Sequence, residues 1–395
     1  MISHRQLFLN HVAQTSDAPL ALEFVKAEGV YLINEKGEKT IDLIAGIGVS
    51  NIGHSHPAVV AAVQNQAAKY MHLMVYGEFV QCPQTDLAQK LTALLPKSLD
   101  SVYFTNSGAE ATEGAMKLAK RYTQRSKFIH FKKSYHGSTQ GALSILGDEF
   151  FKQNFRPLLP DITALEYNNI EQLDAIDHKT AAVILDVVQA ESGITVATRE
   201  FIAAIENKCK ETGALLIIDE AQTAMGRTGK LFVIEHYNLV PDILLLAKAF
   251  GGGMPLGAFV ANKKIMQTLT NNPVLGHITT FGGHPVSCAA GLAALAVLEN
   301  ENLIASVEEK GSLFEEKLVH PAILKTTRIG LMMALYFDSF ETNKKIIDEC
   351  IANGVLTDWF LFESNAMRIC PPLVISEEEI IFSCKIILAA IEKHG

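Results

Sequence analysis

Short apolar runs alternate with amphipathic stretches through the middle of the chain, from about residue 85 to residue 285. The runs are SVYFT, KFIHF, AAVILDVV, ALLIID, ILLLA and GAFVA, at residues 101–105, 127–131, 181–188, 214–219, 243–247 and 257–261. Continuous apolar runs of this length are typical of strands buried on both faces of a parallel sheet. The pattern therefore predicts an α/β domain in which helices flank a mostly parallel sheet.

The two ends of the chain show other patterns. Apolar residues flank the turn-like NEKG at residues 34–37, which predicts a small hairpin. After about residue 286 the pattern is helical, and short strands and a closing helix follow. We therefore expect an arm and hairpin over 1–45 that belongs to a small domain, a large α/β domain over 46–285, and a C-terminal α+β domain over 286–395.

Composition narrows the function classes. The 395 residues are 48% hydrophobic and 19% charged, which is ordinary for a globular chain of two domains. The net charge of −9 argues against a nucleic-acid partner. Neither a long apolar run nor a secretory signal pattern is present, so we expect a cytoplasmic protein without a membrane partner. The six cysteines show no CxxC spacing, which predicts buried thiols rather than zinc ligands or disulfides.

A carboxylate and a lysine end two of the apolar runs. Asp219 closes ALLIID and Lys248 follows ILLLA, so both should emerge at the carboxyl edge of the sheet, where ligands bind in open α/β folds. Pyridoxal phosphate suits this pair, because its aldehyde condenses with a lysine and its pyridine nitrogen needs an acidic partner. A structural ion pair explains the two residues alone equally well.

A phosphate site is predicted where SVYFT turns into a helix. Ser107, Gly108 and Ala109 form this turn, and a helix N-terminus offers free N–H groups and a positive dipole end. Simple capping of the helix by Ser107 is the alternative.

Longer motifs surround these residues and occur in one order along the chain: TNSGAEATEG, YHG, DEAQTAMGRTG, AKAFGGGMPLGA, ITTF and RICPPL. From about residue 29 to residue 372 the chain resembles the class III, ornithine-type aminotransferases of pyridoxal phosphate fold type I. The acetylornithine aminotransferase group is the most similar. This resemblance implies a large α/β domain that binds the cofactor and a smaller α+β domain.

The resemblance assigns roles around the cofactor. It implies that Lys248 carries pyridoxal 5'-phosphate and moves the substrate proton, and that Asp219 keeps the pyridine nitrogen charged. Gln222 then hydrogen-bonds the ring hydroxyl, and Tyr135, followed by His136, covers the ring.

It also assigns substrate and subunit contacts. Arg368 is implied to bind a carboxylate of 2-oxoglutarate or glutamate, and Glu191 to pair with that arginine as the two substrates alternate. Thr280 matches a residue that reaches the phosphate of a neighbouring subunit, which implies a homodimer.

One position departs from the pattern and leaves the amine donor open. Ser138 stands where related enzymes carry an arginine that binds the donor's carboxylate. Either a cation elsewhere, such as Arg227, compensates, or the donor's carboxylate is absent or lies elsewhere. His284 replaces a common asparagine without an evident role.

The reaction that the resemblance implies is transfer of a terminal amine to 2-oxoglutarate, giving a semialdehyde and glutamate. An Nα-acylated ornithine, in arginine biosynthesis, is the leading donor; N-succinylornithine, lysine, 4-aminobutyrate and a diamine are the alternatives. A catalytically silent cofactor-binding protein is a rival from another class, against which the intact Asp219, Gln222, Lys248 and Thr280 argue. A nucleotide-binding oxidoreductase, suggested by GGG at 251–253, lacks the spaced GxGxxG.

Overall fold

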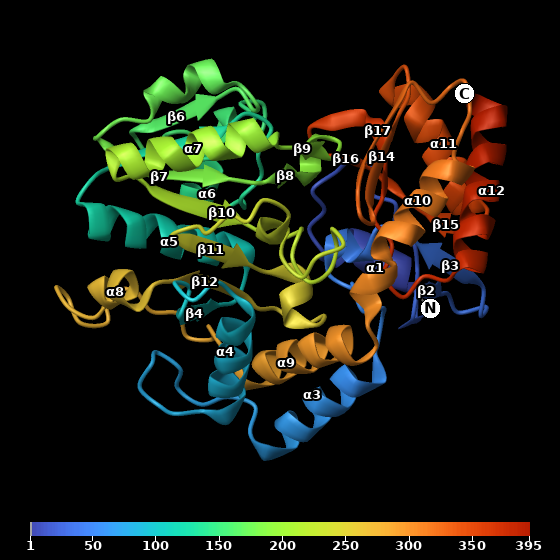
Figure 1. Cartoon of the computed structure of the whole chain (residues 1–395). Coiled ribbons are helices and arrows are strands. Elements are labelled where there is room, and N and C mark those ends of the chain that lie inside the picture. The colour runs from blue at the N-terminus through green and yellow to red at the C-terminus, as the bar shows by residue number, and fades with distance from the viewer. Residues whose placement is uncertain (1) are drawn as a thin grey trace.

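A seven-stranded sheet forms the centre of the larger part of the computed structural model, which describes residues 2–395; it lies on the left in Figure 1. Its order is β4–β12–β11–β10–β7–β5–β6. The strands are β4 (Ser101–Thr105), β5 (Lys127–Phe131), β6 (Ile162–Leu165), β7 (Thr180–Leu185), β10 (Leu215–Asp219), β11 (Ile243–Leu246) and β12 (Gly257–Ala261). Only β12 runs antiparallel to its neighbours, so the sheet is mostly parallel, as predicted.

Two sequence expectations for this sheet were wrong in detail. The sequence pattern did not predict β6, whose ITAL run is short and mixed in polarity. The run 181–188 does not form one strand, because β7 ends at Leu185 and the chain turns at Asp186. Val188 then begins β8 (Val188–Gln189), which pairs with β9 (Thr195–Val196) in a separate ribbon.

Helices cover both faces of the sheet. Alternate strand residues such as Ile217 and Phe259 pack with the apolar side of α5 (Gly108–Thr123). The intervening residues, such as Ile218, belong to the larger core that includes α7 (Arg199–Thr212). Burial on both faces is the reason that these strands are continuous apolar runs.

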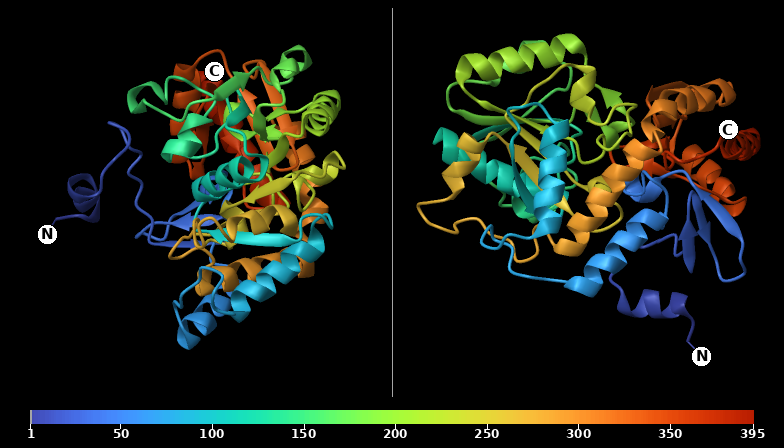
Figure 2. Two further views of the ribbon diagram at one scale, coloured as in Figure 1. Left: turned by 90° about the vertical axis from the view of Figure 1, so that its left-hand side faces the viewer. Right: turned by 60° about the horizontal axis from the view of Figure 1, so that its bottom comes forward.

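Three longer helices pack together below this sheet in the view of Figure 1. They are α3 (Pro57–Lys69), α4 (Cys82–Leu94) and α9 (Pro285–Asn300). The shorter helices are α1 (His4–His11), α2 (Ala45–Gly48), α6 (Gln140–Ser144) and α8 (Lys263–Met266). Helix α1 has no buried residue and stands apart from the body of the chain in both views of Figure 2.

The C-terminal part contains a second sheet, β13–β14–β17–β16, in which neighbours are antiparallel. Its elements are β13 (Lys325–Ile329), β14 (Met332–Tyr336), β16 (Asp358–Phe360), β17 (Glu363–Ile369), α10 (Val307–Lys317), α11 (Phe340–Ala352) and α12 (Glu377–His394). The predicted hairpin is present and joins a third sheet: β1 (Lys26–Glu28), β2 (Tyr31–Ile33), β3 (Lys39–Asp42) and β15 (Val355–Leu356). Residues from both ends of the chain thus share a sheet, while the domain division at 45 and 285 stays a prediction.

Within residues 2–395, no single helix has the length and apolar character to cross a membrane. Only Pro285–Asn300 and Leu303–Lys317 taken together, bent by 60°, have a suitable length and composition. Many apolar residues of α9 are buried within the protein core. Five of the six cysteines are buried free thiols, whereas Cys82 is exposed, contrary to expectation.

Candidate active site

A cavity of about 720 Å³ opens at the carboxyl edge of the large sheet, where the loops after β4, β5, β7, β10 and β11 meet. Ten of the residues singled out from the sequence line it: Ser107, Gly108, Ala109, Tyr135, His136, Ser138, Glu191, Asp219, Gln222 and Lys248. Arg368 and Thr280 are not on its wall. Arg368 lies behind Glu191, and Thr280 is exposed on a separate loop.

The turn before α5 fits a phosphate group. The Ser107 hydroxyl accepts the N–H of Glu110, so the capping alternative describes this residue correctly. Among the described residues, the N–H groups of Gly108 and Ala109 have no protein acceptor. Gly257 allows the close approach of this turn, because a Cβ there would lie 2.3 Å from the Ser107 carbonyl oxygen. Two free N–H groups and the helix dipole therefore face the cavity.

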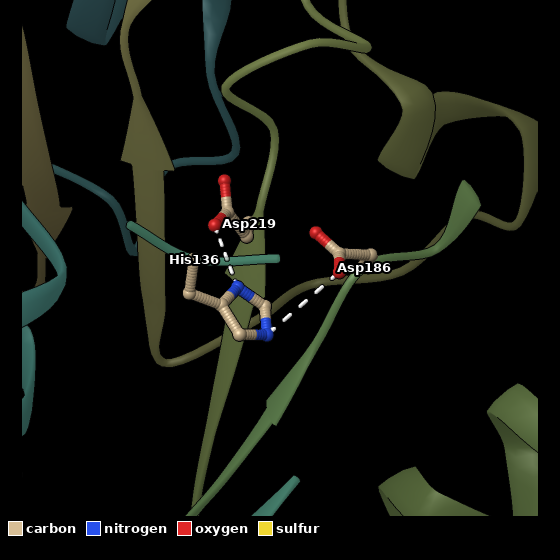
Figure 3. A group of neighbouring side chains, drawn as sticks. All are labelled: His136, Asp186 and Asp219. Atoms are coloured by element: carbon tan, nitrogen blue, oxygen red, sulfur yellow. Dashed lines mark hydrogen bonds and ion pairs between the residues drawn. The ribbon is translucent and has the colours of Figure 1, made fainter. Parts of the chain in front are cut away.

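Asp219 is held by a buried histidine at the end of β10. Its Oδ2 lies 2.8 Å from His136 Nδ1, and its Oδ1 accepts the N–H of Ala221 (Figure 3). Asp186 approaches the other ring nitrogen of His136, with 3.7 Å between Oδ2 and Nε2. Burial alone would lower the pKa of His136, but the carboxylates of Asp186 and Asp219 raise it. His136 is therefore a favourable partner for the Asp219 carboxylate at the cavity wall.

These three side chains also form a set of potential metal ligands, which the sequence did not predict. One ligand atom from each lies within 4.8 Å of the others. Because His136 Nδ1 is already hydrogen-bonded to Asp219, we interpret the trio as a network that holds a proton.

Lys248 begins a short 3-10 helix directly after β11 with a φ of +52°. Left-handed backbone is uncommon for a lysine and is a form of strain that folds retain at functional sites. Burial lowers the pKa of its amine to about 8, with Glu191 opposing the shift and Arg368 assisting it. A larger fraction of this amine is therefore neutral, and nucleophilic, at neutral pH than for an ordinary lysine.

A buried ion pair lies beside the cavity. Arg368 Nη1 and Nη2 contact the two carboxylate oxygens of Glu191 at 3.1 and 2.9 Å, and Arg368 Nε lies 2.9 Å from Asp358. Gln222 Nε2 donates to Glu191 at 2.8 Å. Burial would raise the pKa of Glu191, but the guanidinium of Arg368 lowers it to about 2. Glu191 and Arg368 are thus a charged pair, as the sequence resemblance implied.

Comparison with known proteins decides the family. The profile of class III aminotransferases matches residues 12–391. The chain belongs to the class III aminotransferase family. It is 37% identical to an acetylornithine aminotransferase of Aquifex aeolicus over 370 residues, 92% of this chain and 95% of that protein. The acetylornithine aminotransferase of Archaeoglobus fulgidus is 37% identical over 364 residues, 92% and 94% of the two chains.

Solved structures agree on the fold. The ornithine aminotransferase of Toxoplasma gondii, whose active site holds pyridoxal phosphate, superposes with a TM-score of 0.91 at 28% identity, covering 98% of this chain and 93% of that one. The adenosylmethionine-8-amino-7-oxononanoate aminotransferase of Methanocaldococcus jannaschii gives 0.92 at 28% identity, covering 99% and 98%. The chain is therefore a pyridoxal-phosphate-dependent aminotransferase with the fold of its class.

The cavity of this class III aminotransferase fits its cofactor. Free N–H groups at Gly108 and Ala109 suit the phosphate, the Asp219 carboxylate suits the ring nitrogen, and Lys248 supplies the amine. Tyr135 adds an aromatic side chain to the wall, where its Oη lies 3.1 Å from Ser138 Oγ. The specific contacts of these residues with the cofactor, including that of Gln222 with the ring hydroxyl, stay predictions.

Neither Arg227 nor His284 lies where it could replace the arginine that is absent at Ser138. Arg227 does not supply it, because its guanidinium is fully buried and donates to Asn51 and to the carbonyls of Leu331 and Pro371. His284 precedes α9 and stacks near His72, with ring centroids 5.9 Å apart, outside the cavity wall.

Sequence reasoning missed several wall residues of this site. Among them are Val49, Lys133, Asp186 and Val188. Asp186 had a signal, since it is the one carboxylate within the apolar run 181–188. Lys133 had a weaker signal, a lysine two residues before Tyr135 in the same loop.

Proposed function

We propose that this enzyme transfers the terminal amine of an Nα-acylated ornithine to 2-oxoglutarate, giving the acylated semialdehyde and glutamate in arginine biosynthesis. The observation that carries the proposal is the 37% identity to acetylornithine aminotransferases over 92% of the chain. The buried Arg368–Glu191 pair beside the cavity supports it, because the two substrates differ in whether a carboxylate adjoins the reacting carbon.

The acylated ornithine presents an amine on a plain methylene carbon. No carboxylate then reaches Arg368, so Glu191 stays on the guanidinium. 2-Oxoglutarate carries a carboxylate next to its carbonyl, and this group can take the place of Glu191 on Arg368, since both are planar carboxylates that suit the guanidinium fork. One cavity can in this way accept both substrates in turn.

When bound, pyridoxal phosphate supplies an aldehyde that accepts the amine and a protonated ring that takes up electrons from the substrate carbon. Lys248, once free, removes the proton from that carbon and returns one during the opposite transfer. Its low pKa favours this role, because a base works best when its pKa lies near the operating pH. Asp219, paired with His136, would provide the carboxylate that keeps the ring nitrogen protonated.

We also propose a cytoplasmic homodimer in which Thr280 contacts the phosphate site of the partner subunit. Two exposed segments, 71–80 and 274–281, support this assembly, because they carry large apolar side chains that monomers rarely leave uncovered. The exposed apolar residues are Met71, Phe79 and Val80 in the first segment and Val274 and Phe281 in the second. Tyr76 Oη lies 3.5 Å from Thr280 Oγ1 and joins the two segments.

The test is the amine half-reaction of the purified holoenzyme. N-acetylornithine, N-succinylornithine, ornithine, lysine, 4-aminobutyrate and putrescine are added singly, and loss of the absorbance of the cofactor's aldehyde form is followed. Fast loss with an acylated ornithine is expected. Reaction only with glutamate and a diamine would place the enzyme outside arginine synthesis, and no reaction with any amine would indicate a silent cofactor-binding protein.

A further inference from the structure

We propose that Lys133 is the cation that binds the carboxylate of the amine donor. The inference rests on the proposed function, because an acylated ornithine carries such a carboxylate. Among the described residues on the cavity wall, Lys133 and Lys248 are the only lysines, and none is an arginine. Lys248 is needed for the cofactor, so Lys133 remains to neutralise a substrate carboxylate.

The backbone at Lys133 is held in an unusual conformation. Its φ is +58°, in the left-handed region where glycine is favoured over lysine. Its N–H donates to Gly147 O at 2.9 Å, and Gly147 N donates back to Ser134 O at 2.8 Å. A Cβ at Gly147 would lie 2.4 Å from Lys133 N, so the glycine makes this close pairing possible. Strain of this kind, in a loop that faces a cavity, indicates a function for the side chain.

The side chain is available for a ligand. Lys133 Nζ lies 2.7 Å from Glu363 Oε2, and the lysine side chain is 51% exposed. An exposed ion pair of this kind contributes little to stability, so it does not explain why a strained lysine is kept. A substrate carboxylate can replace Glu363 at the ammonium group without burying an unpaired charge.

Glu363 places this ammonium group on the substrate side of the cavity. Glu363 begins β17, the strand that also carries Arg368. The two residues before it, Leu361 and Phe362, donate backbone N–H groups to Glu191. The Lys133–Glu363 pair therefore adjoins the loop that presents Glu191, and Ser138 lies on the same cavity wall.

The test uses unreactive analogues with the holoenzyme. N-acetylnorvaline is N-acetylornithine without its terminal amine, and N-butylacetamide lacks the carboxylate as well. Isothermal calorimetry gives Kd for each. In Lys133→Gly, which suits the left-handed backbone, we expect Kd for N-acetylnorvaline to rise about fivefold, the loss expected for one ion pair at a half-exposed ammonium group. Kd for N-butylacetamide should change by less than about twofold, and Lys133→Arg should restore much of the binding.

Two further variants separate binding from a structural role. Lys132→Gln is the matched control, because Lys132 pairs with the exposed Glu166 and is not on the cavity wall, so it should change neither Kd. Glu363→Gln removes the carboxylate that competes for Lys133 and should lower Kd for N-acetylnorvaline. A merely structural pair would instead make Lys133→Gly and Glu363→Gln act in the same direction.

The outcomes distinguish the two proposals. If the Lys133→Gly protein still prefers N-acetylnorvaline as strongly as the unmodified protein does, the inference is overturned and the donor assignment stands. If the unmodified protein shows no preference for N-acetylnorvaline over N-butylacetamide, the donor assignment is overturned and the inference with it. Thermal unfolding of Lys133→Gly and Glu363→Gln verifies that both variants are folded.

Discussion

Replacing Glu191 with glutamine should make the enzyme bind glutamate and 2-oxoglutarate more tightly. In the structure Glu191 occupies both outer nitrogens of Arg368, and their side chains are only 9% and 4% exposed. Any substrate carboxylate that reaches Arg368 must first displace this one. Glutamine is similar in shape but neutral, so it competes less well for the guanidinium.

The size of the effect follows from the pKa of Glu191. Its surroundings lower that pKa from 4.5 to about 2, which corresponds to about 3 kcal/mol in favour of the ionised form at 1.36 kcal/mol per pH unit. Burial opposes this shift of the pKa, and Arg368 outweighs it, with smaller contributions from Lys248 and Gln222. We therefore take about 3 kcal/mol as an upper bound and expect affinity for glutamate to rise about tenfold to a hundredfold.

Single-turnover kinetics of the holoenzyme measure this directly. The dependence of the half-reaction rate on glutamate concentration gives the affinity for glutamate. The same measurement with N-acetylornithine gives the affinity for the amine donor, for comparison. The selectivity for N-acetylornithine over glutamate should fall in Glu191→Gln. Arg368 keeps Asp358 as a partner at 2.9 Å, so the variant should remain folded. Glu166→Gln, which removes an exposed carboxylate, is the control. Unchanged or weaker binding of glutamate would show that Glu191 does not compete for Arg368.

Three further predictions concern the cofactor site and the subunit interface. Lys248→Ala should abolish turnover yet retain weak, reversible cofactor binding, and normal turnover in this variant would contradict the assignment. In the unmodified apoenzyme, the rate of covalent cofactor attachment should rise with pH and level off near pH 8, because the pKa of Lys248 is about 8. A rate that continues to rise to pH 10 would contradict this pKa. Burial raises the pKa of Asp186 to about 7, and its charge above that pH supports the protonated His136. We therefore expect kcat of the half-reaction to increase as the pH rises through 7. Asp186→Asn should remove this increase, which a pH profile of the half-reaction measures. Thr280→Ala should weaken cofactor binding, measured by equilibrium dialysis, and mixing it with Lys248→Ala should restore one intact site in each heterodimer, because the unmodified lysine and threonine then meet across the interface; an unchanged affinity, or no gain of activity on mixing, would argue against a Thr280 contact with the partner's phosphate.

The sequence predicted six of the seven strands of the large sheet and the charged residues, Asp219 and Lys248, that follow two of them. Strands such as Leu215–Asp219 and Ile243–Leu246 are buried on both faces, so each reads as an unbroken apolar run that ends at a charge or a small residue. The Glu191–Arg368 pair was also expected, but only through resemblance, because 177 positions separate the two residues and nothing local joins them.

The environment of Asp219 was not predictable, because it depends on the order of the strands. His136 follows β5, Asp186 follows β7 and Asp219 ends β10, and these strands are adjacent in the sheet. Apolar periodicity identifies strands but does not give their order, so three residues far apart in the sequence gave no sign of meeting. The left-handed backbone of Lys133 was not predictable for a similar reason, since it depends on the hydrogen bond from the Lys133 N–H to the carbonyl of Gly147.

Two cationic side chains of this site are each paired with a carboxylate of the protein where a substrate carboxylate would bind. Arg368 holds Glu191 in a buried pair, and Lys133 holds Glu363 in an exposed one. An acylated ornithine has one carboxylate and displaces only Glu363, at small cost, because an exposed pair is weak. 2-Oxoglutarate has two, so it can engage both cations and offset the loss of the buried pair with a second contact. A monocarboxylate such as pyruvate has no such compensation, and the enzyme should therefore discriminate against it even though its reacting end is identical.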